Sequence, residues 1–172
     1  MGALFSLLTV CLAPQDEPPK PTEHHRHLKA LVGTWDTVTR YPQMKELPEA
    51  KGVDTTVMAF RGLWLISDYK IETPGRTVEG HGILGYDVEK KKYVGVWIDS
   101  WSTRLDLNEG ECDGEGKVHT WRSEAQDHTG KMTRWKIVHQ SEDLDTRVLT
   151  IHRIDAGEKE TPVMVCTYRR RK

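Results

Sequence analysis

From Gly33 almost to the C-terminus, the chain repeats short segments with strand-like alternation, separated by turns rich in Gly, Asp, Glu and Lys. No long stretch of helical periodicity interrupts the series, which is typical of one antiparallel all-β domain. The pattern predicts strands at residues 34–41, 53–61, 63–72, 76–86, 92–101, 103–111, 117–125, 131–140, 147–154 and 163–170. Because the connecting turns are short, each strand is expected to pair with the next one along the chain.

A meander of about ten strands either closes on itself or leaves an exposed edge. Closure predicts a single antiparallel up-and-down β-barrel with an interior large enough for a small ligand. In front of the strands, Leu28, Leu31 and Val32 have helical spacing behind Thr22 as an N-cap. We therefore expect a short N-terminal helix that plugs or leads into the barrel, and a barrel domain over residues 22–172.

The first 21 residues differ from the rest of the chain. An apolar run at 3–13 is followed by a proline-rich linker at 14–21. The run is too short to span a bilayer as a helix and has the length of the apolar part of a signal peptide, although no basic segment precedes it. We expect export, to the periplasm in a bacterium. The alternative is an uncleaved tail on a cytoplasmic protein.

The charge of the chain indicates which classes of partner are not expected. Its 26 acidic and 25 basic residues are interleaved and give a net charge of −1. A nucleic-acid or anionic-membrane partner leaves a stronger electrostatic signature, so neither is expected. The one basic cluster, residues 169–172, is predicted to be a solvated tail. The pattern makes no prediction of oligomeric state.

Sequence motifs assign no catalytic residue. The chain lacks G-x-S-x-G, H-E-x-x-H, C-x-x-C and P-loop patterns. Residues 80–85 match G-x-G-x-x-G, but a dinucleotide site needs these glycines to open a helix, and here they are expected to relieve crowding within a strand. Three cysteines form neither a disulfide scaffold nor a metal site; Cys112 and Cys166 either pair or stay free.

Histidine and tryptophan supply the candidate binding residues. With a period of two, Trp135 and His139 share one face of a strand, and His119 shares a face with Trp121. If these faces look inward, an aromatic lumen with imidazole groups suits a small, partly polar organic ligand or a metal-bound group. The alternative is that the histidines are hydrogen-bonded core residues. The lumen candidates are Trp35, His81, Tyr86, Trp97, Asp99, His119, Trp121, Trp135 and His139.

Two further groups of polar residues carry expectations. His24, His25 and His27 lie on the predicted helix and are expected to be solvated rather than to bind metal. Asp99 lies between two tryptophans in segment 97–101, which is expected to be covered on both faces. Its partner would be Arg104, His81 or His119, either in a buried ion pair or as a general base with a raised pKa.

Several motifs together resemble a known family. Gly33-Thr34-Trp35, GHGILGYD at 80–87, YVGVWIDS at 93–100 and TYR at 167–169 are similar to the uncharacterised bacterial domain-of-unknown-function family 1579. The resemblance covers residue 24 to the end; it implies a calycin-type, lipocalin-like barrel and no established activity.

A more remote resemblance concerns haem. Gly33, Trp35, Tyr41 and Pro42 are similar to landmarks of the nitrobindin-like haem barrels. That likeness would imply an iron-binding histidine on the C-terminal strand. Val163 stands at that position, so haem is disfavoured as a cofactor.

Three functions are compatible with the sequence. The first is a lipocalin-like barrel that binds a small hydrophobic or amphipathic ligand in its lumen. The second is an enzyme that uses Asp99 and a strand histidine, His119 or His139, as acid and base in the same lumen. The third is a filled barrel that serves as a structural or interaction module.

Overall fold

The computed structural model describes residues 17–126 and 129–172. The helical and strand elements, in chain order, are α1 (Glu23–Lys29), β1 (Gly33–Arg40), β2 (Ala50–Ala59), η1 (Phe60–Gly62), β3 (Trp64–Thr73), β4 (Arg76–Asp87), β5 (Lys92–Asp99), β6 (Asp106–Cys112), β7 (Val118–Gln126), β8 (Met132–Ser141), β9 (Thr146–Ile154), η2 (Ala156–Glu158) and β10 (Glu160–Arg170). The apolar run at 3–13 lies outside the described residues.

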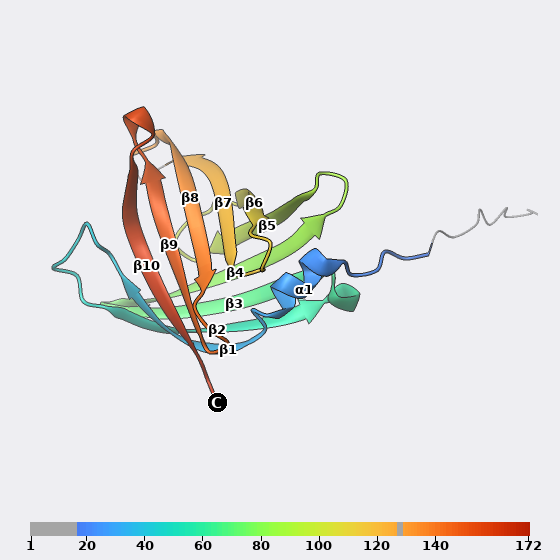
Figure 1. Cartoon of the computed structure of the whole chain (residues 1–172). Helices are drawn as coiled ribbons and strands as arrows, with labels where there is room; N and C mark the ends of the chain where they lie inside the picture. Colours follow the sequence, from blue (N-terminus) through green and yellow to red (C-terminus); the bar gives the residue numbers. More distant parts are fainter. Residues whose placement is uncertain (1–16, 127–128) are drawn as a thin grey trace, which may run out of the picture.

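Strand pairing closes the sheet into a barrel (Figure 1). Each strand is antiparallel to the next, and β1 closes the ring against β10, with Trp35 opposite Arg170. The predicted all-β up-and-down barrel with a short N-terminal helix is therefore confirmed. The largest boundary differences are at β2, which begins at Ala50, at β10, which begins at Glu160, and around residues 100–105, which form a connection rather than strand ends.

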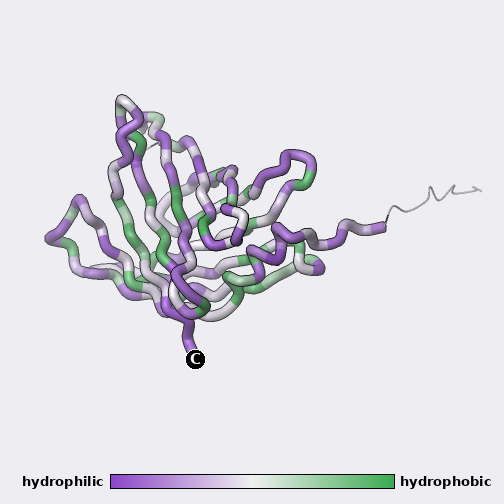
Figure 2. Tube along the Cα trace, viewed as in Figure 1, coloured by the Kyte–Doolittle hydropathy of each residue, from purple (hydrophilic) through white to green (hydrophobic). Residues whose placement is uncertain are grey.

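Alternation along each strand separates the two faces of the wall. In β7, His119 and Trp121 are buried, whereas Arg122 and Glu124 are exposed. Figure 2 shows the same alternation of hydrophilic and hydrophobic residues along the strands. Since side chains one apart on a strand point to opposite faces, the buried set lines the lumen.

Helix α1 covers one end of the barrel, which we call the helix end; the opposite end is called the far end (Figure 1). Leu28 and Leu31 pack into the helix end against Leu65, Tyr93 and Trp121. Toward the far end of β5, β8 and β9, by contrast, the inward-facing side chains of Trp97, Trp135, Leu149 and Ile151 are only half-buried, whereas Ile71 of β3 stays buried. The hydrophobic core under the helix therefore sits at the helix end, a second cluster of Trp35, Cys166 and Tyr168 adjoins it, and burial decreases toward the far end of β5, β8 and β9. No helix in residues 17–126 and 129–172 is long and apolar enough to span a membrane.

The G-x-G-x-x-G run lies inside β4 and opens no helix. A Cβ atom on Gly80 would collide with the indole ring of Trp97, and one on Gly82 would lie 3.1 Å from that ring. Gly85 meets Trp64 on the other face in the same way. The prediction that these glycines relieve crowding in a strand is confirmed.

The prediction that the basic C-terminal cluster is a solvated tail is wrong for Arg170, whereas Arg169, Arg171 and Lys172 are exposed. Arg170 belongs to β10, and its guanidinium donates hydrogen bonds to the carbonyl oxygens of Val32 (2.6 Å), Ala30 (3.3 Å) and Leu144 (3.0 Å). Arg171 pairs with Asp36. The Ala30 carbonyl belongs to the C-cap of α1, where carbonyls lack partners within the helix and attract cationic donors, and those of Val32 and Leu144 lie in connections between elements.

Candidate functional site

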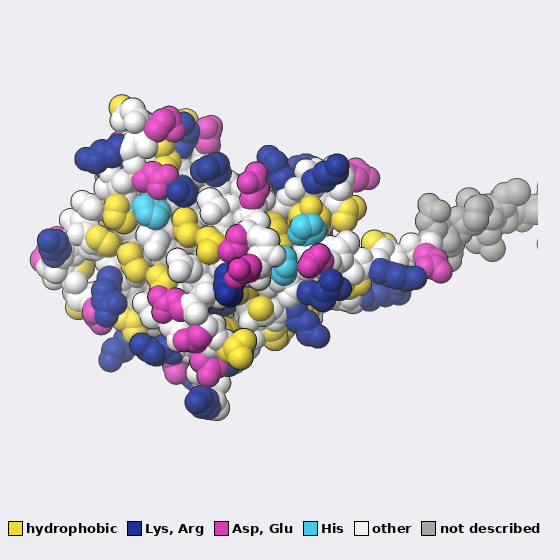
Figure 3. Space-filling view, viewed as in Figure 1, with side chains coloured by type: hydrophobic (Ala, Val, Ile, Leu, Met, Phe, Trp, Pro, Cys, Tyr) yellow, Lys and Arg dark blue, Asp and Glu magenta, His cyan; other side chains and the backbone are white. Residues whose placement is uncertain are grey.

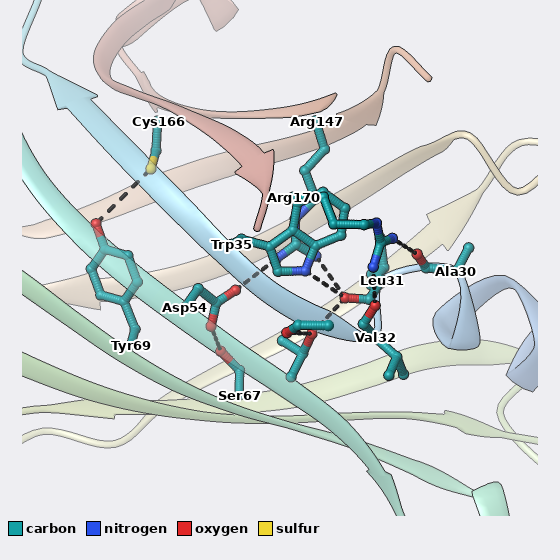
Figure 4. A network of polar contacts seen from close by, with 12 residues as sticks. Ala30, Leu31, Val32, Trp35, Asp54, Ser67, Tyr69, Arg147, Cys166 and Arg170 are labelled. Carbon is teal, nitrogen blue, oxygen red and sulfur yellow. Dashed lines mark hydrogen bonds and ion pairs between the residues drawn. The ribbon is translucent and has the colours of Figure 1, made fainter. Parts of the chain in front are cut away.

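A buried ion pair lies in the lumen at the helix end (Figure 4). Arg147 Nη2 donates to Asp54 Oδ2 at 2.6 Å, and the Ser67 hydroxyl donates to Asp54 Oδ1 at 2.6 Å. The two charged side chains are only 3% and 6% exposed. Burial raises the pKa of the Asp54 carboxyl, and the Arg147 guanidinium and Ser67 hydroxyl oppose that rise. The charges of the two side chains offset each other inside the barrel.

Aromatic rings cover the arginine. The Arg147 guanidinium lies 4.1 Å from the ring centre of Trp35 and 4.5 Å from that of Tyr168. Its Nη1 donates to the Leu31 carbonyl at 3.3 Å, which also accepts a bond from Trp35 Nε1 at 3.0 Å. These contacts tie the end of α1 to β1 and β9. Cation–π contact of this kind is favourable where water is excluded.

Arg147 and four lumen-facing residues beside it form a cluster that we call the polar belt; its members are Thr37, His119, His139, Arg147 and Tyr168. They are neighbours around the wall. On neighbouring strands, His119 pairs in register with His139, and Tyr168 pairs with Arg147 on one side and with Thr37 on the other. The ring centres of His139 and Tyr168 are 5.8 Å apart. Their positions on β1, β7, β8, β9 and β10 make one continuous arc.

The polar belt holds unpaired polar atoms. Both ring nitrogens of His119, Nε2 of His139, Nε of Arg147 and the hydroxyl of Thr37 are buried and have no hydrogen-bond partner among the described residues. His119 and His139 are only 1% and 8% exposed. Buried polar groups in proteins normally have partners, so this cluster is the strongest indication of a binding site.

Burial keeps the two imidazoles neutral near pH 7. Burial, together with the charge of the neighbouring His27, lowers the pKa of His119 to about 4. Burial and the Arg147 charge place the pKa of His139 well below its usual value. His119 packs against Tyr93 and Trp121, with ring centres 5.1 and 6.2 Å away. Each neutral ring has one donor and one acceptor nitrogen.

The register shows where the nine predicted lumen residues lie. Trp35, Tyr86, Trp97, Asp99, His119, Trp121, Trp135 and His139 are on the inward face. His81 is on the outer face, where its Nδ1 lies 2.8 Å from Asp68 Oδ1, so its expected lumen position is wrong. The alternation pattern could not decide which side of β4 faces inward, because glycines occupy the positions beside His81.

Asp99 has a local structural role. It ends β5, accepting hydrogen bonds from Trp97 Nε1 (3.1 Å) and from the backbone N–H groups of Trp101 (2.9 Å) and Ser102 (3.0 Å). Trp101 is 60% exposed and Ile98 is also exposed. The expectation that this segment is covered on both faces, with Asp99 in a buried ion pair, is therefore wrong. The strand ends at Asp99, and the carboxylate caps the turn that follows.

The structure does not bring Asp99 and His119 together. Tyr93, which contacts His119, is near the start of β5, and Asp99 is at its end. Six residues of strand separate these positions by about 20 Å. An acid–base pair of Asp99 with a lumen histidine is thus not assembled in this arrangement.

The histidines of α1 are packed rather than solvated, contrary to expectation. His25 is buried, His24 stacks on Tyr86 at 3.8 Å between ring centres, and His27 Nδ1 lies 3.1 Å from the Tyr93 hydroxyl. They lie where the helix meets aromatic residues of β4 and β5. His24 and His27 also border a cleft of about 330 Å³ at the helix end.

A larger groove, of about 500 Å³, lies over β3, β4 and β5 near the far end. Its lining includes the inward-facing Tyr69 and Asp99 together with charged residues of the outer face. The Tyr69 hydroxyl in turn contacts Thr39 at 3.1 Å and Cys166 Sγ at 3.9 Å. Tyr69 therefore connects this groove with the interior next to the polar belt.

The described residues offer few ligands for a metal ion or a haem iron. Within the described ranges, no group of three His, Cys, Asp or Glu side chains could hold a metal ion. Cys112 and Cys166 are free. Val163 lies in β10 where the register shifts between Pro162 and Met164, and its isopropyl group cannot coordinate iron. This position does not fit a haem ligand.

Sequence reasoning missed Asp54, Arg147 and Arg170. Charged residues in an antiparallel strand are ordinarily assigned to the solvent face. The available signal was the period of two, which places Asp54 on the same face as Thr56 in β2, and Arg147 on the same face as Leu149 in β9. Periodicity alone does not identify the buried ion pair, because it does not show that Asp54 of β2 and Arg147 of β9 meet inside the barrel.

Comparisons with known proteins identify a family and similar solved structures. The family model described as "Protein of unknown function (DUF1579)" matches residues 20–170. No curated protein matches the chain. Among solved structures, the S-type phycobiliprotein lyase CPES from Guillardia theta is similar with a TM-score of 0.57 at 11% identity, over 88% of this chain and 99% of that chain. A de novo designed fluorescence-activating β-barrel gives a TM-score of 0.43 at 17% identity, over 83% of this chain and 95% of that one.

Proposed function

The chain belongs to the DUF1579 family, whose description assigns no function, and we propose that it is a binding protein that holds a small hydrophobic or amphipathic molecule in its barrel lumen. The cluster of unpaired polar atoms in the polar belt carries this proposal. Each such buried atom costs about 1–3 kcal/mol when it has no partner. A bound molecule that supplies hydrogen-bond partners recovers that free energy.

The rest of the lumen supports an apolar body for this molecule. Trp97, Trp135, Leu149 and Ile151 face inward but are only half-buried. Apolar side chains in that state gain free energy when a ligand covers them, at about 25 cal/mol per Å². Binding pockets commonly combine such apolar walls with a few polar groups that orient the ligand. The likeness to the phycobiliprotein lyase supports the barrel fold alone.

Native mass spectrometry of the protein as purified, compared with denaturing mass spectrometry, tests the proposal. A mass excess that disappears on denaturation is expected. In parallel, the neutral fluorophore N-phenyl-1-naphthylamine is titrated into protein that has been stripped by extraction with an apolar resin. Saturable fluorescence enhancement is expected, and it should weaken at least about threefold in Trp135→Ala.

The control is Trp101→Ala, because Trp101 is an exposed indole outside the lumen. It should bind the fluorophore as the parent protein does. If stripped, folded protein shows no saturable enhancement, or if Trp101→Ala weakens binding as much as Trp135→Ala, the lumen is not the binding site. The filled-barrel alternative would then be favoured.

A further inference from the structure

We infer that the molecule held in the lumen is an organic acid, whose carboxylate binds at the polar belt and is taken up together with one proton. This inference rests on the proposed function and names the chemical class of its ligand. Three observations lead to it. They are the shortage of hydrogen-bond acceptors in the belt, its charge balance, and the apolar wall beside it.

The shortage of acceptors follows from the arginine. Arg147 donates through Nη2 to Asp54 and through Nη1 to Leu31, but its Nε–H finds no acceptor among residues 17–126 and 129–172. A guanidinium can only donate. His119 adds at least one unpaired N–H, because neither of its ring nitrogens is bonded. A carboxylate only accepts, with about four lone-pair positions, so it matches this excess of donors.

Charge balance accounts for the proton. Asp54 already offsets Arg147 at 2.6 Å, so a further carboxylate would be an uncompensated buried charge. The belt contains two imidazoles that can take up a proton from solution. The groups that face them are Tyr93, Cys112, Asp113, His27 and His139 around His119, and Arg147, Tyr168 and His119 around His139.

The proton passes from solvent to the site that the carboxylate and the two imidazoles share. No covalent bond forms or breaks. The proton can sit on an imidazole, beside a carboxylate, or on the carboxyl group, beside a neutral imidazole; these are two states of one coupled titration. In either state, each acid molecule that was ionised in solution binds together with one proton. The uptake therefore reports on the head group whichever atom holds the proton.

Apolar residues beside the polar belt determine how the ligand is oriented in the lumen. From His139 toward the far end, the inward positions of β8 are Ile137, Trp135 and Thr133, with Ile151 opposite Ile137. An alkyl or aryl body along these residues points to the far end, with the head group at the belt. Because the belt atoms are shut off from solvent, entry of the head group requires side chains of the lumen to move aside.

Isothermal titration of stripped full-length protein tests the inference with decanoate, 1-decanol and methyl decanoate. Each is measured at pH 7.5 in two buffers that differ in ionisation enthalpy. Decanoate is expected to bind at least about tenfold more tightly than the alcohol or the ester, with uptake of about one proton per molecule. Its apparent affinity should rise as the pH is lowered from 8 to 6.5.

Variants assign the proton to the belt. In the double variant His119→Gln/His139→Gln, decanoate should lose its advantage over 1-decanol and its proton uptake, while binding of N-phenyl-1-naphthylamine persists. His81→Gln, a histidine on the outer face, should behave as the parent. If the double variant does not fold, His139→Gln alone should halve the uptake or more.

The outcomes separate the two proposals. If the fluorophore binds but decanoate, alcohol and ester compete equally and no proton is taken up, the acid inference is overturned and lumen binding stands. If decanoate binds with proton uptake that survives in the histidine variants, the head group lies elsewhere and the inference is also overturned. If neither the fluorophore nor any alkyl compound binds, the proposed function itself fails.

Discussion

Arg147 and Asp54 show how one buried contact can organise the end of a barrel. Their 2.6 Å contact is surrounded by Trp35, Tyr168 and the Leu31 carbonyl. Taking two charges out of water is expensive, so such a pair contributes little net stability compared with an apolar pair of the same shape. Removal of one partner, in contrast, leaves a buried charge without compensation.

That asymmetry predicts the behaviour of two variants. Arg147→Met should lower the free energy of unfolding by about 3–5 kcal/mol, because it leaves the Asp54 carboxylate alone. Asp54→Leu/Arg147→Met should recover more than half of this loss. Urea unfolding followed by tryptophan fluorescence measures both. A double variant no more stable than the single one would show that the ion pair is not the source of the effect.

At this scale the sequence predicted faces better than partners. A period of two grouped Trp135 with His139 and His119 with Trp121 on shared strand faces, because it depends only on strand geometry, but it left open which faces look inward. It could not show that Asp99 caps a turn, since that depends on where β5 ends. It could not pair Arg147 with Asp54 either, because the two are brought together only by closure of the barrel.

Helix α1 is held at both of its ends by polar contacts. At its start, His25 Nδ1 accepts a hydrogen bond from the Thr22 N–H at 3.0 Å. That role requires the nitrogen to be unprotonated. At its C-terminal end, carbonyl oxygens accept hydrogen bonds from Arg170. The element is short, so these contacts and the packing of Leu28 determine whether it stays in place.

The buried histidines predict a pH dependence of stability. Burial lowers the pKa of His25, His119 and His139, so the unfolded chain binds protons at a higher pH than the folded chain does. The free energy of unfolding should be fully present above about pH 7 and fall as the pH drops below 6.5. His119, whose folded pKa is about 4, should alone remove about 2 kcal/mol by pH 5.

Urea unfolding at half-unit steps from pH 8 to 5 tests this dependence. The slope should flatten in His119→Gln, which cannot take up a proton, and remain in His81→Gln, whose histidine is on the outer face. A flat profile in the parent protein would contradict the assignment of neutral buried imidazoles.

Arg170 predicts a specific loosening of α1. Arg170→Ala should lower the free energy of unfolding by about 1–3 kcal/mol, because the carbonyls of Ala30 and Val32 lose a charged donor. Hydrogen exchange of the α1 amides should accelerate. Arg169→Ala is the matched control, since Arg169 is the exposed neighbour on the same strand, and it should leave both measurements unchanged.

At the scale of the whole molecule, the barrel is well packed at the helix end, and its inward side chains on β5, β8 and β9 are less buried toward the far end. Its outer surface mixes charges: the face in Figure 3 carries Lys and Arg side chains interspersed with Asp and Glu. The barrel was predictable because alternation and short turns recur through the chain and leave closure as the way to remove both edges. The ligand was not, because its site depends on unpaired atoms that emerge only when five strands meet.

The free cysteines predict that the barrel needs no disulfide. Cys112 and Cys166 are unpaired in the described part of the chain, Cys166 is almost fully buried, and burial raises the pKa of the Cys112 thiol to about 11. The midpoint of thermal unfolding should therefore shift by less than about 2 °C on addition of dithiothreitol. A larger decrease would reveal a stabilising disulfide.

Closure of the ring by β1 and β10 has a consequence for biosynthesis. Trp35 pairs with Arg170, so the first strand emerges from the ribosome well before its partner has been translated. At roughly 5–20 residues per second, that delay is on the order of ten seconds. During this interval one backbone edge of β1 is available to other nascent chains, and the lumen comes into being only once the last strand has been translated.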